Sequence, residues 1–106
     1  MWGGTLTDPA TNTMHEIEVR DLSKYGVRVA CDKSFPSGAP LDVEIRFPEA
    51  YPAARNIRAS VKVVHSYKLE DQRRHRIGCH FVHLDGVSQV QIEKFISWMK
   101  GRAKKD

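Results

Sequence analysis

The feature that most constrains the fold is an alternation of apolar and polar residues with a period of two along most of the chain. The clearest run spans residues 41–47, and similar runs cover residues 15–20, 27–29, 57–63 and 76–81. Because successive side chains of a strand point to opposite faces, each run predicts a strand with one buried face.

Turn-forming residues separate these runs, notably Asp8-Pro9 and the segments 35–38 and 48–52. The pattern therefore predicts about five or six short antiparallel strands. Many short strands at regular spacing favour a small closed β-barrel over an open sheet, because closure removes the edge strands.

The period changes after Asp85-Gly86. Four apolar residues then follow at i, i+3, i+4 and i+7, which predicts an amphipathic helix over about residues 88–100. The stripe consists of Ile92, Phe95, Ile96 and Met99, with Trp98 at its edge.

Capping residues suggest where this helix begins and ends. Ser88 and Gln91 fit a capping box at its start, although Asp85 can cap it instead. Gly101 is expected to end the helix, and a basic tail follows over residues 101–106.

Length and composition indicate one folded domain over residues 1–106. Hydrophobic residues make up 41% of the chain and charged residues 28%, which allows a core and argues against disorder. No segment approaches the roughly 20 apolar residues of a membrane span, and no signal peptide is evident. We expect a soluble, cytosolic protein in which Cys31 and Cys79 are buried free thiols, since they lie on separate apolar runs.

A D-x-S-x-x-G motif lies between two of the predicted strands, at residues 21–26. Asp21 and Ser23 can accept hydrogen bonds from nearby backbone N–H groups, and Gly26 can adopt a positive φ angle. These properties describe a tight turn, and taken alone the motif indicates no more than that.

The motif and its neighbours together resemble the PilZ domain family. The similar segments are residues 19–29, a strand, the turn and a second strand; residues 40–48, an amphipathic strand; and residues 76–81, a final strand before a helix. The resemblance covers roughly residues 13–100. It implies a mainly β fold, a small closed antiparallel β-barrel of about six strands with a C-terminal α-helix.

The resemblance also implies a ligand and a site. PilZ domains are best known as non-catalytic bacterial sensors of cyclic di-GMP, and in the family the D-x-S-x-x-G turn contacts guanine. Asp21 would accept hydrogen bonds from guanine N1–H and its exocyclic amine, with Ser23 nearby, Gly26 allowing close approach and Arg20 as a neighbour. No cofactor and no metal are implied.

The family's second motif, R-x-x-x-R, does not occur before Asp21, where Arg20 is the first arginine. Either these arginines belong to a longer protein, or the chain is a variant that has lost half of the site. Some positions could partly replace them: Arg28, Arg74, Arg76 and His80.

The implied role is a cytoplasmic regulatory module that links cyclic di-GMP to motility, pili or exopolysaccharide through a partner protein or a fused effector domain. One alternative is an adaptor of the same fold that ignores the nucleotide. Another is a weak nucleic-acid-binding barrel, which the net charge of +4 and the basic segment 73–76 allow.

Other chemistries lack the necessary residues. No nucleophile and base have a recognisable spacing, so we expect no catalysis. His75, Cys79 and His83 alternate onto one face of the last strand, but residues four apart on a strand are about 13 Å apart. That distance is too great for them to share a zinc ion, so no metal site is expected.

Overall fold

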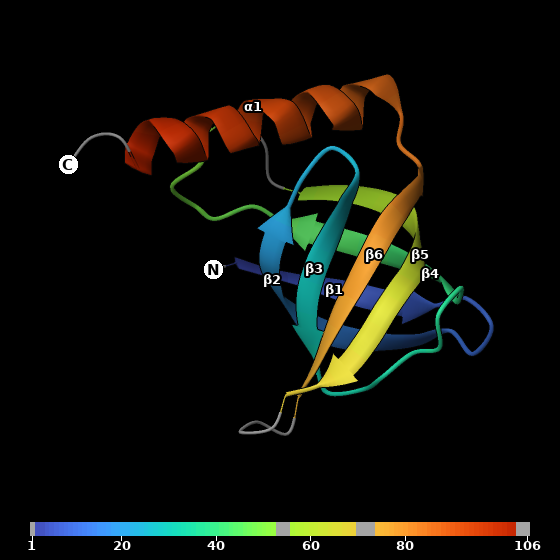
Figure 1. Ribbon diagram of the computed structural model, residues 1–106. Helices are drawn as coiled ribbons and strands as arrows, with labels where there is room; N and C mark the ends of the chain where they lie inside the picture. The colour runs from blue at the N-terminus through green and yellow to red at the C-terminus, as the bar shows by residue number, and fades with distance from the viewer. Residues whose placement is uncertain (1, 53–55, 70–73, 104–106) are drawn as a thin grey trace.

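Six antiparallel strands close into a barrel, and one helix lies across an end of it (Figure 1). The structure, a computed structural model, describes residues 2–52, 56–69 and 74–103. The elements are β1 (Trp2–Asp8), β2 (Thr13–Leu22), β3 (Gly26–Cys31), β4 (Pro40–Arg46), β5 (Asn56–Lys68), β6 (His75–His83) and α1 (Gly86–Ala103). The strand order is β1-β2-β3-β6-β5-β4, and pairing of β1 with β4 closes the barrel. The fold class predicted from the sequence is confirmed.

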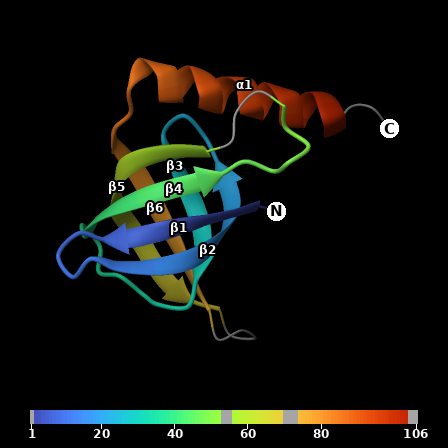
Figure 2. The ribbon, with the colours of Figure 1, turned by 180° about the vertical axis from the view of Figure 1, so that it is seen from behind.

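Strand β1 is the element that alternation did not reveal. It contains Gly3 and Gly4, which contribute no side chain to a hydrophobic pattern. A Cβ atom at Gly4 would collide with the carbonyl oxygen of Glu44 on β4, so the absent side chain allows the closing strands to approach each other. Figure 2 shows β1 and β4 side by side.

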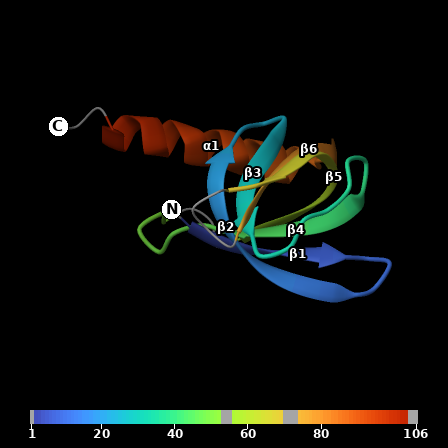
Figure 3. The same cartoon turned by 60° about the horizontal axis from the view of Figure 1, so that its bottom comes forward.

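The apolar side of each alternating run points into the barrel. On β4, for example, Leu41, Val43 and Ile45 are buried while Asp42 faces solvent. Because every strand is paired on both sides, the main-chain groups of the barrel are largely satisfied without a free edge. Figure 3 shows the strands closing on themselves with α1 beyond them.

An aromatic cluster of five residues, Trp2, Phe47, Tyr51, Phe95 and Trp98, joins α1 to the barrel. The ring of Phe95 lies at its centre, with centroid distances of 4.6 Å to Phe47, 5.0 Å to Tyr51 and 5.1 Å to Trp2. Phe95 is almost completely buried. Aromatic contacts therefore help to pack the helix on the barrel, and they contribute about 0.5–1.5 kcal/mol per pair beyond their buried area.

The exposed and buried faces of α1 differ in part from the predicted stripe. Ile92 and Phe95 are buried and Ile96 is partly buried, as expected. Met99 is exposed, and Trp98 packs against the core in its place. No helix in residues 2–52, 56–69 and 74–103 is long and apolar enough to cross a membrane.

The ends of α1 also differ from the prediction. Asp85 caps the helix, because its Oδ1 accepts a hydrogen bond of 2.7 Å from the Ser88 N–H. This bond lowers the pKa of the Asp85 carboxyl. The capping box at Ser88 and Gln91 was therefore wrong, and the alternative is found. Gly101 does not end the helix, which continues through Ala103 into the expected basic tail, since Gly101 lacks the left-handed φ of a terminating glycine.

Candidate ligand-binding site

The D-x-S-x-x-G motif forms the turn between β2 and β3, at the end of the barrel that faces α1 (Figure 1). Ser23 organises this turn. Its Oγ accepts hydrogen bonds from the N–H groups of Tyr25, at 3.1 Å, and Gly26, at 3.3 Å. The Ser23 N–H donates to the Gly26 carbonyl at 3.0 Å. The serine therefore fixes the turn that carries the other motif residues.

Gly26 is needed for a reason that the sequence did not reveal. A positive φ angle was expected there, but among the described glycines only Gly38 has one. A Cβ atom at position 26 would instead collide with the carbonyl oxygen of Cys79 on β6. The glycine lets the turn lie against the neighbouring strand, where the Phe81 N–H donates to the Tyr25 carbonyl at 2.9 Å.

A bulge in β2 separates Arg20 from the motif. Val19 pairs with Val29 and Asp21 pairs with Arg28, so that Arg20 is the additional residue on β2. Its Nε lies 3.1 Å from a carboxylate oxygen of Glu18, and its side chain does not line the pocket described below. The structure thus brings Asp21, Ser23 and Gly26 together and places Arg20 elsewhere.

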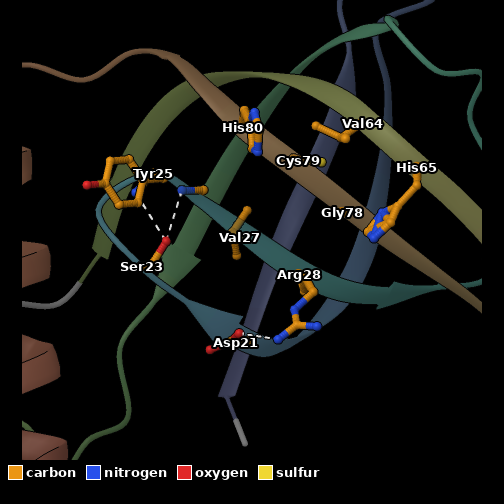
Figure 4. Close-up of a pocket in the computed structure, with 11 residues that line it drawn as sticks. Asp21, Ser23, Tyr25, Val27, Arg28, Val64, His65, Gly78, Cys79 and His80 are labelled. Carbon is orange, nitrogen blue, oxygen red and sulfur yellow. Dashed lines mark hydrogen bonds and ion pairs between the residues drawn. The ribbon is translucent and has the colours of Figure 1, made fainter.

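Asp21 faces a cation on the adjacent strand. The Nη2 of Arg28 lies 2.5 Å from Asp21 Oδ2, and this hydrogen-bonded carboxylate raises the pKa of Arg28. Both side chains are about half exposed, and Figure 4 shows them pointing toward each other. An exposed ion pair of this kind contributes little to stability, so it can exchange for contacts with a ligand.

These residues line an open pocket of about 280 Å³ between the turn and strands β5 and β6 (Figure 4). Its polar and aromatic lining comes from Asp21, Ser23, Tyr25, Arg28, His65 and His80. Tyr25 is 69% exposed, as expected for a residue at the rim of a pocket. The pocket therefore combines a carboxylate, a guanidinium, two imidazoles and an aromatic face.

His65 is a lining residue that the sequence did not indicate. The register of β5 shifts between Val63, which pairs with Cys79, and His65, which pairs with Gly78. The imidazole consequently lies directly over Gly78, where a Cβ atom would collide with the ring (Figure 4). Burial raises the pKa of the neighbouring Cys79 thiol to about 11. A bulge leaves no signature in the alternation of apolar and polar residues, so His65 could not be identified from the sequence.

The residues proposed as partial substitutes for R-x-x-x-R, three arginines and one histidine, divide into two groups. Arg28 and His80 line the pocket. Arg74 does not, because its guanidinium donates to the Ala30 carbonyl at 3.1 Å and lies 3.6 Å from a carboxylate oxygen of Glu18. Arg76 also lies outside the pocket lining. Arg73, which belongs to the basic segment of the nucleic-acid-binding alternative, lies outside the described residues.

The cysteines behave as expected, since both are buried free thiols. His75 and His83 are the first and last residues of β6, with Cys79 midway between them. The strand therefore spreads these three potential ligands along its length, as its spacing predicted.

Comparisons with known proteins agree with this fold. The barrel is similar to the PilZ domain of YcgR from Escherichia coli, solved with c-di-GMP (15% identity, TM-score 0.74, covering 98% of this chain and 85% of that one). It is also similar to the Bacillus subtilis inhibitor of motility MotI/DgrA (16%, 0.79, 99% and 49%) and to apo MrkH from K. pneumonia (16%, 0.80, 99% and 49%). The chain thus spans about half the length of the latter two. Comparison with curated proteins gave no match.

A sequence profile gives the family directly. The profile of the PilZ domain matches residues 4–98, which include all six strands almost completely and most of α1. It also includes the turn at residues 21–26 and every residue that lines the pocket beside it. On this match, the chain belongs to the PilZ domain family.

Proposed function

We propose that this domain is a non-catalytic, cytoplasmic regulatory module that binds cyclic di-GMP at the pocket beside the β2–β3 turn. The observation that carries the proposal is the convergence of Asp21, Ser23 and Gly26 with Arg28 on one open pocket. Membership of the PilZ family supports the choice of ligand, and so does the fold shared with a PilZ domain solved with c-di-GMP.

Asp21 provides selectivity for guanine. The Watson–Crick edge of guanine carries two adjacent donors, N1–H and the exocyclic amine, which match the two oxygens of a carboxylate. Adenine has an acceptor at N1, so its lone pair would face the carboxylate instead. A pocket with Asp21 on its wall should therefore prefer guanine to adenine.

Arg28 takes a second role when the ligand binds. Guanine would displace its guanidinium from Asp21, and the freed group would contact the guanine O6 and N7 or a phosphate. His80 on β6 lines the same pocket and can donate to a phosphate. Arg28 would supply some of the positive charge that the R-x-x-x-R motif provides in the family, and His80 would supply a hydrogen-bond donor.

The size of the pocket limits what enters it. About 280 Å³ lies just below the usual range for drug-sized ligands, so it accommodates one guanine base rather than a whole cyclic dinucleotide. The exposed ring of Tyr25 is placed at the rim, where it can stack on a base. The remainder of the ligand would lie over the outer surface, where a partner protein can recognise it.

We infer that the domain transmits the signal through a protein partner or a fused effector domain, in control of motility, pili or exopolysaccharide. The fold shared with an inhibitor of motility supports such a role. The two free cysteines are consistent with a reducing, cytoplasmic location. Ordering of a bound nucleotide at the pocket would change the surface that the partner meets.

Isothermal titration of the chain with cyclic di-GMP, with cyclic di-AMP in parallel, tests the proposal. We expect saturable binding that is selective for the guanine ligand. Asp21→Asn should weaken it at least about tenfold, because one acceptor becomes a donor facing guanine N–H groups. Asp42→Asn is the matched control, since Asp42 is an exposed strand aspartate outside this pocket.

Three results would contradict the proposal. Absence of binding at high ligand concentration would favour the nucleotide-independent adaptor. Equal affinity of the Asp21→Asn variant and the wild type would remove Asp21 from the site. Salt-sensitive binding of single-stranded oligonucleotides without binding of cyclic di-GMP would favour the nucleic-acid-binding alternative.

A further inference from the structure

A second cluster of chemically active side chains lies away from the nucleotide pocket, at the carboxyl end of β3. It consists of His15 on β2, Cys31 at the last position of β3, and Asp32 directly after it. One potential ligand atom from each residue lies within 4.8 Å of the others. Figures 1 and 2 show this end of β3 on the side of the barrel away from α1.

We propose that His15, Cys31 and Asp32 form a zinc-binding site. The donor set consists of an imidazole nitrogen, a thiolate sulfur and a carboxylate oxygen, all of which bind zinc in proteins. A thiolate favours zinc over magnesium or calcium, which prefer oxygen ligands alone. Three protein ligands leave one tetrahedral position for water.

Two of the three distances between the ligand atoms are close to those of a formed site, and the third is within 4.8 Å. His15 Nδ1 lies 3.6 Å from Asp32 Oδ1, and Cys31 Sγ lies 3.7 Å from the same oxygen. Zn–N, Zn–O and Zn–S bonds of about 2.0–2.3 Å in a tetrahedron place such atoms about 3.3–3.7 Å apart. Small side-chain movements would therefore bring the three ligands to one metal ion.

The environment of the His15 side chain supports a metal site at this position. The His15 side chain is only 14% exposed, and its Nε2 is buried without a hydrogen-bond partner in the described part of the chain. At 3.6 Å, its Nδ1 is also beyond hydrogen-bond length from Asp32. A metal ion would bind at Nδ1, the ring nitrogen that faces Asp32, and would give that atom the interaction it lacks, whereas Nε2 is not a ligand of the proposed site. The ring of Phe35, 5.6 Å away and edge-on, limits how far the imidazole can turn.

The surroundings set the character of the site. Cys31 is completely buried, whereas the Asp32 side chain is 77% exposed, so the proposed site lies where the core meets the surface. Binding forms a Zn–S bond and releases the Cys31 thiol proton to solvent, without oxidation or reduction. The ion would join the start of β2 to the end of β3. It would thereby stabilise the barrel at the end opposite the β2–β3 turn.

Cobalt(II) gives a direct test, because a cobalt–thiolate bond produces a charge-transfer band in the near ultraviolet. The reduced, metal-free chain is titrated with Co²⁺, and Zn²⁺ is then added. We expect one tetrahedral Co²⁺ per chain, displaced by Zn²⁺, and a higher Tm with Zn²⁺. Cys31→Ser should abolish the band, while Cys79→Ser, which removes the other buried thiol, should keep it.

A surface variant keeps the test valid if Cys31→Ser fails to fold. Asp32 is exposed, so Asp32→Asn should preserve the fold and weaken Co²⁺ binding at least about tenfold, while Asp42→Asn has no effect. The proposal is overturned if the wild type gives no band or if the band survives in Cys31→Ser. It is also overturned if Asp32→Asn binds Co²⁺ as tightly as the wild type. These results do not depend on cyclic di-GMP.

Discussion

Arg28 is paired with Asp21 directly across the β2–β3 ladder, with 2.5 Å between the guanidinium and carboxylate. The carboxylate that the turn presents to the pocket is therefore matched by a cation from the next strand. Under the proposed function, a guanine would displace this pairing, and each partner would then contact a different part of the ligand.

Replacing Arg28 tests whether its guanidinium contacts the ligand once guanine has displaced it from Asp21. Arg28→Ala should weaken cyclic di-GMP binding about tenfold and reduce its salt dependence, because one phosphate-directed cation is lost. Arg28→Lys should restore the salt dependence but only part of the affinity, since lysine lacks the planar fork. Titration at low and high salt measures both. Tighter binding by Arg28→Ala would instead mean that the ion pair only competes with the ligand.

Tyr25 is expected to act through its ring. Tyr25→Ala should weaken cyclic di-GMP binding by about 1–3 kcal/mol, the usual contribution of one aromatic ring stacked on a base. Tyr25→Phe should bind as the wild type does, because the stacking face is kept. The two variants are compared by calorimetry, and a loss of affinity in Tyr25→Phe would assign the effect to the hydroxyl.

The close approach at Gly26 predicts a stability effect. Gly26→Ala places a methyl group against the Cys79 carbonyl and should destabilise the protein by about 1–3 kcal/mol. Gly101→Ala is the control, because its Cβ meets open space in a helix and should be neutral or stabilising by up to about 1 kcal/mol. Urea unfolding of both variants measures the difference. Equal stability of the two variants would show that the turn can move away from β6.

The buried thiol of Cys79 predicts a loss of stability at alkaline pH. The folded state holds its proton up to a pKa of about 11, whereas the ordinary pKa is 9.0, so the folded chain binds more protons between these values. The resulting stabilisation is complete below pH 9 and is lost as the pH rises to about 11. We expect this thiol to account for about 2–3 kcal/mol of that decline.

Cys79→Ala isolates this contribution from the other groups that titrate at high pH. Its free energy of unfolding should fall less steeply between pH 9 and 11 than that of the wild type, whatever its stability at pH 7. Parallel slopes for the two proteins in urea titrations would show that the thiol ionises in the folded state at its ordinary pKa.

Much of this fold is determined by signals that act over a few residues. Alternation locates strands because each side chain reports its own face, and the change of period after Asp85 locates the helix. Strand β1 is not located by alternation, because Gly4 has no side chain to report a face. A glycine is needed there because β4, which is distant in sequence, packs closely against it. The start of α1 was ambiguous for a similar reason: two capping patterns overlap, and only the backbone geometry selects Asp85.

The site was predictable where it depends on one turn and unpredictable where it depends on register. Asp21, Ser23 and Gly26 lie within six residues, so their proximity follows from the motif. The bulge in β5 shifts the pairing register with β6 by one residue, and the His65 side chain lies over Gly78 as a result. His15 lies near Cys31 although the two are distant in sequence, a proximity that no local pattern encodes.

The aromatic cluster contains intrinsic fluorescent probes of the position of α1. The chain has two tryptophans, Trp2 and Trp98, and both contact the ring of Phe95. Intrinsic tryptophan fluorescence therefore monitors the packing of α1 on the barrel, because one tryptophan lies on β1 and the other on α1. An emission change on adding a nucleotide or a partner would mean that the helix has moved, whereas events at the opposite end of β3 would be optically silent.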